Sequence, residues 1–298
     1  EVYVTTRRNI PAENHLHYLQ RNAKDDAFLA ELLKKKYDVI VDFMVYGSEE
    51  LKKRLPTLLS HTKQYIFFSY SRVYAASDTP LTETSPRLLD ACKDTVYLQT
   101  DEYALAKARE ENLLMESGHR NWTIIRPYIT YNDQRLQLGV YEKENWLYRA
   151  LHGRTIVMPA DIAAKKTSLT YGSDVAAVVA SFIGNEKTFG QAFHIVNPET
   201  MTWGNILQLY LDVIEGKTGR RSKVKWIDDS LGLQKVWNPW QIRYDRLYDR
   251  AFDSSKVNLI CGGYHYKSMK NGLQECLERF LDRPKWLGIN WLYEAWAD

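Results

Sequence analysis

A tyrosine and a lysine four residues apart, Tyr103 and Lys107, are the residues of this sequence whose types and spacing best suit catalysis. On a helix, residues at positions i and i+4 lie on one face, one turn apart. A phenol has an ordinary pKa of about 10, but a neighbouring ammonium favours the phenolate and lowers that pKa. The pair could therefore exchange a proton with an alcohol or sugar oxygen. The same pattern also arises by chance on helices that have no catalytic role.

Hydroxyl groups follow two apolar segments on either side of this pair. Ser69 and Ser71 follow the segment Gln64–Phe68, and Thr130 follows Trp122–Arg126 and Pro127. Ligands of open parallel sheets bind at the carboxyl ends of the strands. Ser69 or Ser71 could orient a reacting oxygen there. Alternatively, each hydroxyl satisfies only the backbone of its own loop.

The elements that must position these residues alternate between strands and helices in the first half of the chain. Strands are expected at Val2–Thr6, Tyr37–Met44, Gln64–Tyr70 and Trp122–Arg126, and helices at Asp25–Lys36, Glu49–Ser60 and Asp101–Gly118. The strand at Gln64–Tyr70 is almost wholly apolar, as expected when both faces of a parallel sheet are covered. The alternation predicts the α/β class, with a Rossmann-type doubly wound parallel sheet.

The alternation changes after Tyr131. Helices are expected at Glu142–His152, Asp174–Ile183 and Thr202–Gly216, and strands at Thr155–Met158 and Ala192–Val196. We therefore expect a dinucleotide-binding part over residues 1–131 and a smaller mixed α/β substrate part over 132–298, with some of its elements returning to the sheet.

Composition excludes several classes of protein. The 298 residues carry a net charge of +3, which neither demands nor excludes nucleic acid. No apolar run approaches the length of about 20 residues that a membrane helix needs. Cys92, Cys261 and Cys276 lie far apart and predict reduced thiols in a cytoplasmic protein. No His, Cys or carboxylate cluster has metal-ligand spacing, so we expect no metal site.

The order of these motifs resembles that of the extended short-chain dehydrogenase/reductases, the family of NAD(P)-dependent nucleotide-sugar epimerases, dehydratases and reductases. The resemblance covers most of the chain. It rests on the basic strand end at 6–9, the strand 38–44, the segment 69–74, the Tyr103/Lys107 pair, Arg126-Pro127 with Tyr131, the segment 169–176 and the turn 252–256.

The resemblance implies that Tyr103 is the catalytic acid/base and that Lys107 binds the nicotinamide ribose and tunes Tyr103. The family usually has Ser or Thr at the position of Tyr70, so Ser69 or Ser71 shifts in, Tyr70 supplies the hydroxyl, or the site is impaired. Family dehydratases carry an Asp-Glu pair where this chain has Ser71-Arg72. A 4-epimerase or 4-ketoreductase acting on a nucleotide-sugar by hydride transfer is therefore favoured over a dehydratase.

The residues expected to bind the cofactor lie at strand ends. Arg7 and Arg8 end the first strand, where an arginine accommodates the 2′-phosphate of NADP, so NADP is preferred to NAD unless both side chains simply face solvent. By the resemblance, Asn22 contacts the adenine, and Phe43 and Met44 pack beside a ribose. Lys107, Pro127 and Thr130 complete this expected set.

Polar and aromatic residues after the last of these strands are expected around the substrate. They are Tyr70, Tyr131, Asn132, Arg135, Gln137, Tyr171 and Arg250. A homodimer is expected from the resemblance alone. The alternative is an atypical member of the family that binds RNA or regulates without dehydrogenase activity. The alternation of Tyr244, Arg246, Tyr248 and Arg250 suits RNA contact.

The family's glycine-rich phosphate-binding turn is absent, and Gly47 is the first glycine of the chain. In the family that turn follows a first strand, which in sequence would precede Glu1 by roughly 20–30 residues. In the sheet, this strand would lie between Val2–Thr6 and the strand Tyr37–Met44 or Gln64–Tyr70. Without it, two strand edges would be unpaired in the middle of the sheet. Either the sequence is a fragment of a longer chain, which we favour, or the pyrophosphate cradle is lost. In both cases we expect this chain alone to be weakly active or inactive, which a micromolar affinity for NADPH would contradict.

Overall fold

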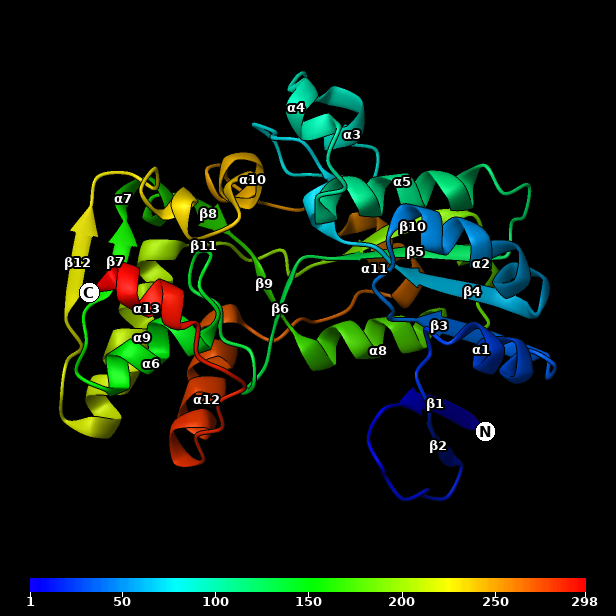
Figure 1. Cartoon of the computed structure of the whole chain (residues 1–298), viewed down its shortest axis with the longest axis horizontal. Helices are drawn as coiled ribbons and strands as arrows, with labels where there is room; N and C mark the ends of the chain where they lie inside the picture. The colour runs from blue at the N-terminus through cyan, green and yellow to red at the C-terminus, as the bar shows by residue number, and fades with distance from the viewer.

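Four parallel strands form the central sheet of the computed structural model, which describes residues 1–298 (Figure 1). Their order across the sheet is β10 (Gln191–Ile195), β5 (Trp122–Pro127), β4 (Thr62–Phe68) and β3 (Tyr37–Asp42). The first three strands of this sheet in chain order, β3, β4 and β5, have nearly the predicted bounds. β10 comes from the second half of the chain and pairs with β5. The predicted α/β class with a parallel Rossmann-type sheet is confirmed.

Helices cover both faces of this sheet because its strands are apolar on both sides. Tyr65 and Phe67 of β4 point to the face covered by α2 (Ser48–Ser60) and α5 (Tyr103–Met115). Ile66, between them, points to the face covered by α8 (Gly172–Phe182) and α11 (Ser255–Cys261). The catalytic candidates of α5 are thereby held at the amino end of a helix that lies on the sheet.

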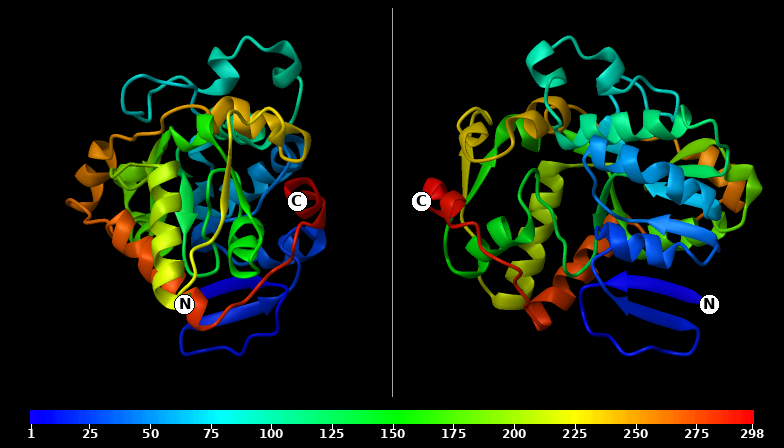
Figure 2. Two further views of the ribbon diagram at one scale, coloured as in Figure 1. Left: turned by 90° about the vertical axis from the view of Figure 1, so that its left-hand side faces the viewer. Right: turned by 45° about the vertical axis from the view of Figure 1, so that its right-hand side comes forward.

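A separate pair of parallel strands lies beyond β3. It consists of β1 (Val2–Thr6), which has the predicted bounds, and β2 (Leu16–Gln20), which was not predicted. No hydrogen-bonded pairing joins β1 to β3, so the sheet is divided at this place, as the sequence led us to expect. Figure 2 shows the pair side by side next to α1 (Asp26–Leu32).

The largest hydrophobic core comprises 36 buried residues, most of which belong to the second part of the chain. Its helices are α6 (Lys143–Leu151), α7 (Ala160–Ala163), α9 (Trp203–Thr218), α12 (Met269–Asp282) and α13 (Trp291–Ala297), and its strands form the pairs β7 (Ile156–Pro159) with β12 (Val224–Ile227) and β8 (Lys166–Thr167) with β11 (Met201–Thr202). Trp146 and Tyr210 stack in this core with ring centroids 4.5 Å apart.

The remaining elements connect the two parts. β6 (Ile129–Tyr131) and β9 (Leu169–Tyr171) pair in the middle of the molecule, and the short helices α3 (Leu88–Ala91), α4 (Thr95–Leu98) and α10 (Pro239–Gln241) lie near the start of α5 (Figure 1). None of the helices combines the length and the apolar character that crossing a bilayer requires.

Candidate active site

A cavity of about 840 Å³ opens at the carboxyl ends of β3, β4 and β5. This is where ligands of open α/β sheets bind, and the volume is within the range of small-molecule sites. One wall is apolar and combines Val2 of β1 with Val41, Phe43 and Met44 at the end of β3. The facing wall is α8, which contributes small residues such as Gly172, Ala176 and Ala180.

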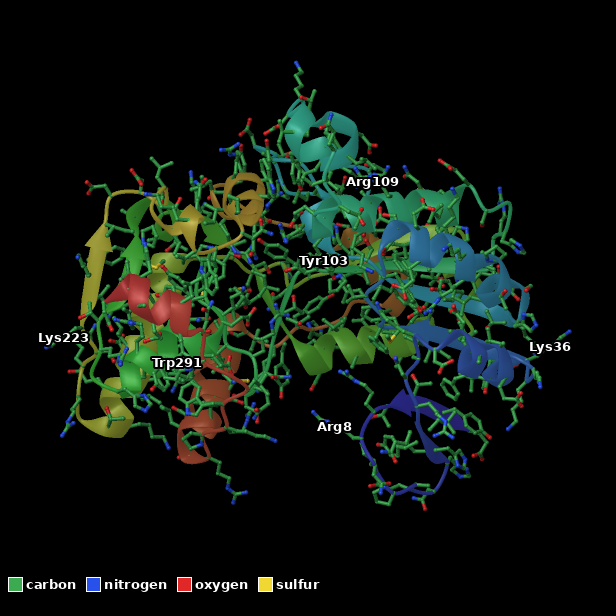
Figure 3. The ribbon with its side chains drawn as sticks, viewed as in Figure 1. Arg8, Lys36, Tyr103, Arg109, Lys223 and Trp291 are labelled. Carbon is green, nitrogen blue, oxygen red and sulfur yellow. The ribbon has the colours of Figure 1, made fainter.

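Tyr103 and Lys107 both line this cavity from the first turns of α5. Figure 3 labels Tyr103 near the middle of the molecule, where the two parts of the chain meet. Tyr103 is 36% exposed, and its hydroxyl makes no hydrogen bond to the protein. Lys107 is buried, and its Nζ lies 5.9 Å from the centroid of the Tyr103 ring and 4.5 Å from that of Phe67. The helical spacing therefore brings the two side chains into one cavity.

The pKa of Tyr103 is shifted in the direction opposite to the expected one. Burial is the largest cause, and together with the neighbouring Tyr70 and Glu110 it raises this pKa to about 12, although Arg72 and Arg135 act in the lowering direction. The expected stabilisation by Lys107 fails because the Lys107 Nζ donates to Glu110 Oε2 at 2.8 Å and so faces a carboxylate instead of the phenol. In this structure Tyr103 is a neutral phenol at physiological pH.

Of the three hydroxyls at the end of β4, only that of Tyr70 is available to a ligand. Ser69 lines the cavity, but its buried Oγ donates to Glu111 Oε1 at 2.5 Å. Ser71 is buried outside the cavity and donates to the carbonyl of Arg126 at 2.8 Å. The Tyr70 ring meets the Tyr103 ring edge-on, with centroids 5.6 Å apart, and makes no hydrogen bond to the protein. The expectation that Ser69 or Ser71 orients the reacting oxygen is therefore not supported, because tertiary partners engage both groups.

A buried ion cluster fixes the strand ends beneath the cavity. Glu111, the residue after Glu110, accepts two hydrogen bonds from Arg126 of β5 (2.8 and 2.7 Å) and one from Arg87 (3.2 Å), in addition to that from Ser69. Glu111 and Arg126 are almost fully buried. The cluster ties α5 to β4 and β5, and thereby fixes Tyr103 relative to Tyr70.

Two guanidinium groups lie in the cavity wall and act on the charge of Tyr103. Arg72 and Arg135 line the cavity. Arg72 donates to the buried Glu102 at 2.8 Å, and Arg135 lies 3.3 Å from Glu142. Sequence reasoning selected Arg135 but treated Arg72 only as a departure from the dehydratase pattern. It also missed Gln241 and Tyr128, which line the cavity from α10 and from the end of β5.

The residues predicted to bind the cofactor divide into two groups. Phe43, Met44, Lys107, Pro127 and Thr130 line the cavity. Arg7, Arg8 and Asn22 do not: all three are exposed, and Figure 3 labels Arg8 beside the β1–β2 pair. The Asn22 side chain accepts from the backbone N–H of Lys24 and caps its own loop.

The residues predicted to bind the substrate divide in the same way. Tyr70 and Arg135 line the cavity, whereas Tyr131, Asn132, Gln137, Tyr171 and Arg250 do not. Tyr131 packs its hydroxyl against Gly272 of α12. Asn132 accepts hydrogen bonds from the backbone of its own turn. Gln137 is buried beside Glu142, and Tyr171 lies against Tyr131 and Lys267.

Both arginines of the motif that suited RNA contact are buried in the core, whereas Tyr248 is 40% exposed. Arg246 and Arg250 are each 1% exposed and surround the buried Asp245. Arg250 donates to the carbonyls of Tyr74, Ala75 and Tyr244. Tyr244 stacks on Tyr97 with centroids 4.4 Å apart. Because Ile242–Arg246 is a π-helical turn, alternation along the sequence does not become one exposed face.

No family model and no curated protein matches the chain. Solved structures do match it. The UDP-N-acetylglucosamine 4-epimerase from Methanobrevibacter ruminantium M1, in complex with UDP-N-acetylmuramic acid, is 16% identical, with a TM-score of 0.68 over 92% of this chain and 86% of that chain. The dTDP-glucose 4,6-dehydratase from Bacillus anthracis, in complex with NAD, is 15% identical, with a TM-score of 0.66 over 91% of this chain and 81% of that chain. The UDP-glucuronic acid 4-epimerase from Bacillus cereus, in complex with UDP-glucuronic acid and NAD, is 15% identical, with a TM-score of 0.66 over 90% of this chain and 83% of that chain. At these identities the likeness establishes the fold alone, which this chain shares with these solved epimerases and dehydratases.

The preference for NADP is wrong. Five of the similar solved structures are complexes with NAD. The structure supplies the physical reason, since Arg7 and Arg8 are exposed and lie outside the cavity. Two arginines at a strand end are a weak signal when nothing holds their side chains toward the ligand.

Proposed function

We propose that this protein is an NAD-dependent enzyme that acts on a nucleotide-sugar, and that it is a 4-epimerase. The observation that carries the proposal is the convergence of Tyr103, Lys107 and Tyr70 on one cavity at the strand ends. Two phenols that make no hydrogen bond to the protein and one ammonium are the groups needed to hold and deprotonate a sugar hydroxyl. The fold shared with solved nucleotide-sugar epimerases supports the same class.

The nicotinamide-ribose half of NAD fits the cavity. Phe43 and Met44 offer an apolar wall, Pro127 and Thr130 also line the cavity, and Lys107 is the cation that would meet the ribose hydroxyls. No glycine-rich turn follows any of the described strands, so these residues include no cradle for the pyrophosphate. When bound, NAD supplies the acceptor for the hydride of the sugar carbon.

The proton steps belong to the chain's own residues. Tyr103 takes the proton of the sugar hydroxyl as that carbon is oxidised and returns it on reduction. A phenol with a pKa near 12 accepts and returns this proton poorly at neutral pH. The Lys107 ammonium therefore has to move closer to the Tyr103 hydroxyl, where its positive charge lowers the pKa of the phenol. The Tyr70 hydroxyl holds the same oxygen from the other side, in the place where the family has Ser or Thr.

The residues beside Tyr70 favour epimerisation over dehydration. A 4,6-dehydration needs an acid and a base next to the hydroxyl at the end of β4. This chain has Ser71, which is buried against a carbonyl, and Arg72, which is paired with Glu102. Neither group can remove or supply the required proton at neutral pH.

The test is turnover of a panel of UDP- and dTDP-hexoses and hexuronic acids with added NAD, with the C4 epimers separated by chromatography. We expect one member of the panel to equilibrate with its epimer, but slowly, because the described residues include no glycine-rich cradle for the pyrophosphate. Tyr103→Phe should lower the rate by about 10²–10⁴-fold, because the general acid/base is gone. Tyr248→Phe is the matched control, since Tyr248 is 40% exposed and lies outside the cavity.

Two results would contradict the proposal. One is the absence of both NAD binding and sugar interconversion in the unmodified protein. The other is interconversion that Tyr103→Phe leaves unchanged, because the reaction would then use another site.

A further inference from the structure

Glu110 is a buried carboxylate that the proposed reaction does not use. It lies three residues after Lys107 on α5 and is 0% exposed. Its Oε2 accepts from the Lys107 Nζ at 2.8 Å, and this is the hydrogen bond that Lys107 makes within the protein. Its Oε1 is buried without a hydrogen-bond partner. The carboxylate is therefore only half satisfied, and its one partner is the cation that faces the cavity.

The surroundings of Glu110 oppose its negative charge. Asp42, at the end of β3, and Asp101, just before α5, both disfavour the ionised form, whereas Lys107 favours it. Asp42 already accepts from the hydroxyls of Tyr46 and Tyr65, and Asp101 accepts from Ser48 and Arg109. Burial is the largest cause, and together these effects raise the pKa of Glu110 to about 7. Near neutral pH the residue is thus divided between a carboxylate that pairs with Lys107 and a neutral acid that does not.

The carboxylate also acts on the reacting groups. Its charge raises the pKa of Tyr103 and that of Tyr65 on the neighbouring strand. Lys107 cannot direct its charge to Glu110 and to Tyr103 with equal effect, because these two partners are on opposite sides of it along the helix. Protonation of Glu110 removes one repulsive charge from Tyr103 and frees the ammonium at the same time.

We propose that Glu110 is a positioning residue that competes with the cavity for the Lys107 ammonium, and that a proton taken up by Glu110 releases Lys107 toward Tyr103 and a bound ribose. The inference rests on the proposed function, in which Lys107 acts beside Tyr103. Glu110 touches none of the reacting atoms itself, since it does not line the cavity. It makes the binding of a dinucleotide depend on pH in the neutral range.

The first experiment needs no nucleotide. Carboxyl carbons of glutamate are labelled with ¹³C, and the Glu110 signal is identified by its loss in Glu110→Gln. We expect this signal to titrate near pH 7, well above ordinary glutamates, and its midpoint to move to higher pH in Lys107→Met, which removes the one favourable charge. A midpoint near that of ordinary glutamates, or one that Lys107→Met leaves in place, would overturn the proposal.

The second experiment measures the dissociation constant of NAD between about pH 6 and 8. If Lys107 is available only while Glu110 is protonated, the apparent affinity falls by up to about tenfold over this range, because the competent fraction falls by that factor. Glu110→Gln should bind with the same affinity at both ends of the range and more tightly than the unmodified protein at the upper end. Glu116→Gln, an exposed change at the end of the same helix, should keep the pH dependence.

A conservative variant separates positioning from simple support of the fold. Glu110→Asp keeps the charge and should keep the pH dependence of NAD binding. This variant can still be measured if Glu110→Gln fails to fold. A Glu110→Gln protein that retains the native pH profile, or that binds NAD more weakly by the same factor at every pH, contradicts the proposal. If the unmodified protein binds no NAD at all, the proposed function fails, whereas the carboxyl titration still decides whether Glu110 competes for Lys107.

Discussion

Glu111 follows Glu110 on the helix, and its replacement by glutamine should destabilise the folded protein. Glu111→Gln keeps the size of the side chain but removes the charge that two guanidinium groups share. Arg126 donates two hydrogen bonds to this carboxylate and Arg87 a third, and Arg126 and Glu111 are almost fully buried. After the substitution, Arg126 remains in the core without a counter-ion.

The expected cost follows from this burial. Removing one partner of a buried ion pair costs about 3–5 kcal/mol, because the other charge stays buried and unpaired. The entropy of unfolding of a 298-residue chain is about 0.6 kcal/mol/K. The melting temperature should therefore fall by roughly 5–8 °C.

Thermal unfolding followed by circular dichroism, with urea unfolding as a second measure, tests this value. Glu116→Gln, on the exposed end of the same helix, should change the free energy of unfolding by no more than about 0.5 kcal/mol. A loss of less than about 1 kcal/mol for Glu111→Gln would refute the reasoning, because the cluster would then contribute no more than an exposed pair.

Two further predictions concern the fold around the site. Gly272→Ala should destabilise the protein by about 1–3 kcal/mol in urea unfolding, because the added methyl group meets the Tyr131 hydroxyl and lies 2.9 Å from its Cζ, and adding Tyr131→Phe should recover part of the loss. Equal stability of the Gly272→Ala protein would show that Tyr131 moves freely. Burial lowers the pKa of His194, so the folded state takes up this proton less readily than the unfolded chain, and stability should fall as the pH drops below about 6.5. His194→Gln should flatten urea midpoints measured between about pH 7 and 5, and an unchanged slope would assign the effect to other groups.

Local patterns predicted the sheet and the position of α5, but not the partners of the side chains. Tyr103 and Lys107 line one cavity, as their spacing of four residues on a helix predicted. Both signals used for this prediction, the helical repeat and the strand end, are local in the sequence. The fate of Ser69 and Ser71 depends on Glu111 and on the Arg126 carbonyl, which lie 42 and 55 residues away. No pattern around the two serines reveals these contacts.

The electrostatics of the site show the same limit. The spacing of Tyr103 and Lys107 is correct for a phenol next to an ammonium, yet Lys107 pairs with Glu110. The spacing of three residues between a lysine and a carboxylate on a helix predicts an ion pair, so this contact could be predicted from the sequence. Arg246 and Arg250 give the converse case, since basic residues that resemble an exposed stripe are buried around Asp245, which directly precedes Arg246 in the sequence.

The division of the sheet has a consequence for how the protein opens. β1 and β2 pair only with each other, and a ribbon of two strands is marginally stable in water. What holds the ribbon to the rest is apolar packing and contacts such as that between the Tyr3 and Tyr37 rings, whose centroids are 6.0 Å apart. We therefore expect the ribbon and the four-stranded sheet to open as separate cooperative units. Since Val2 belongs to the weaker unit, one side of the cavity can detach while Tyr103 and Tyr70 stay in place.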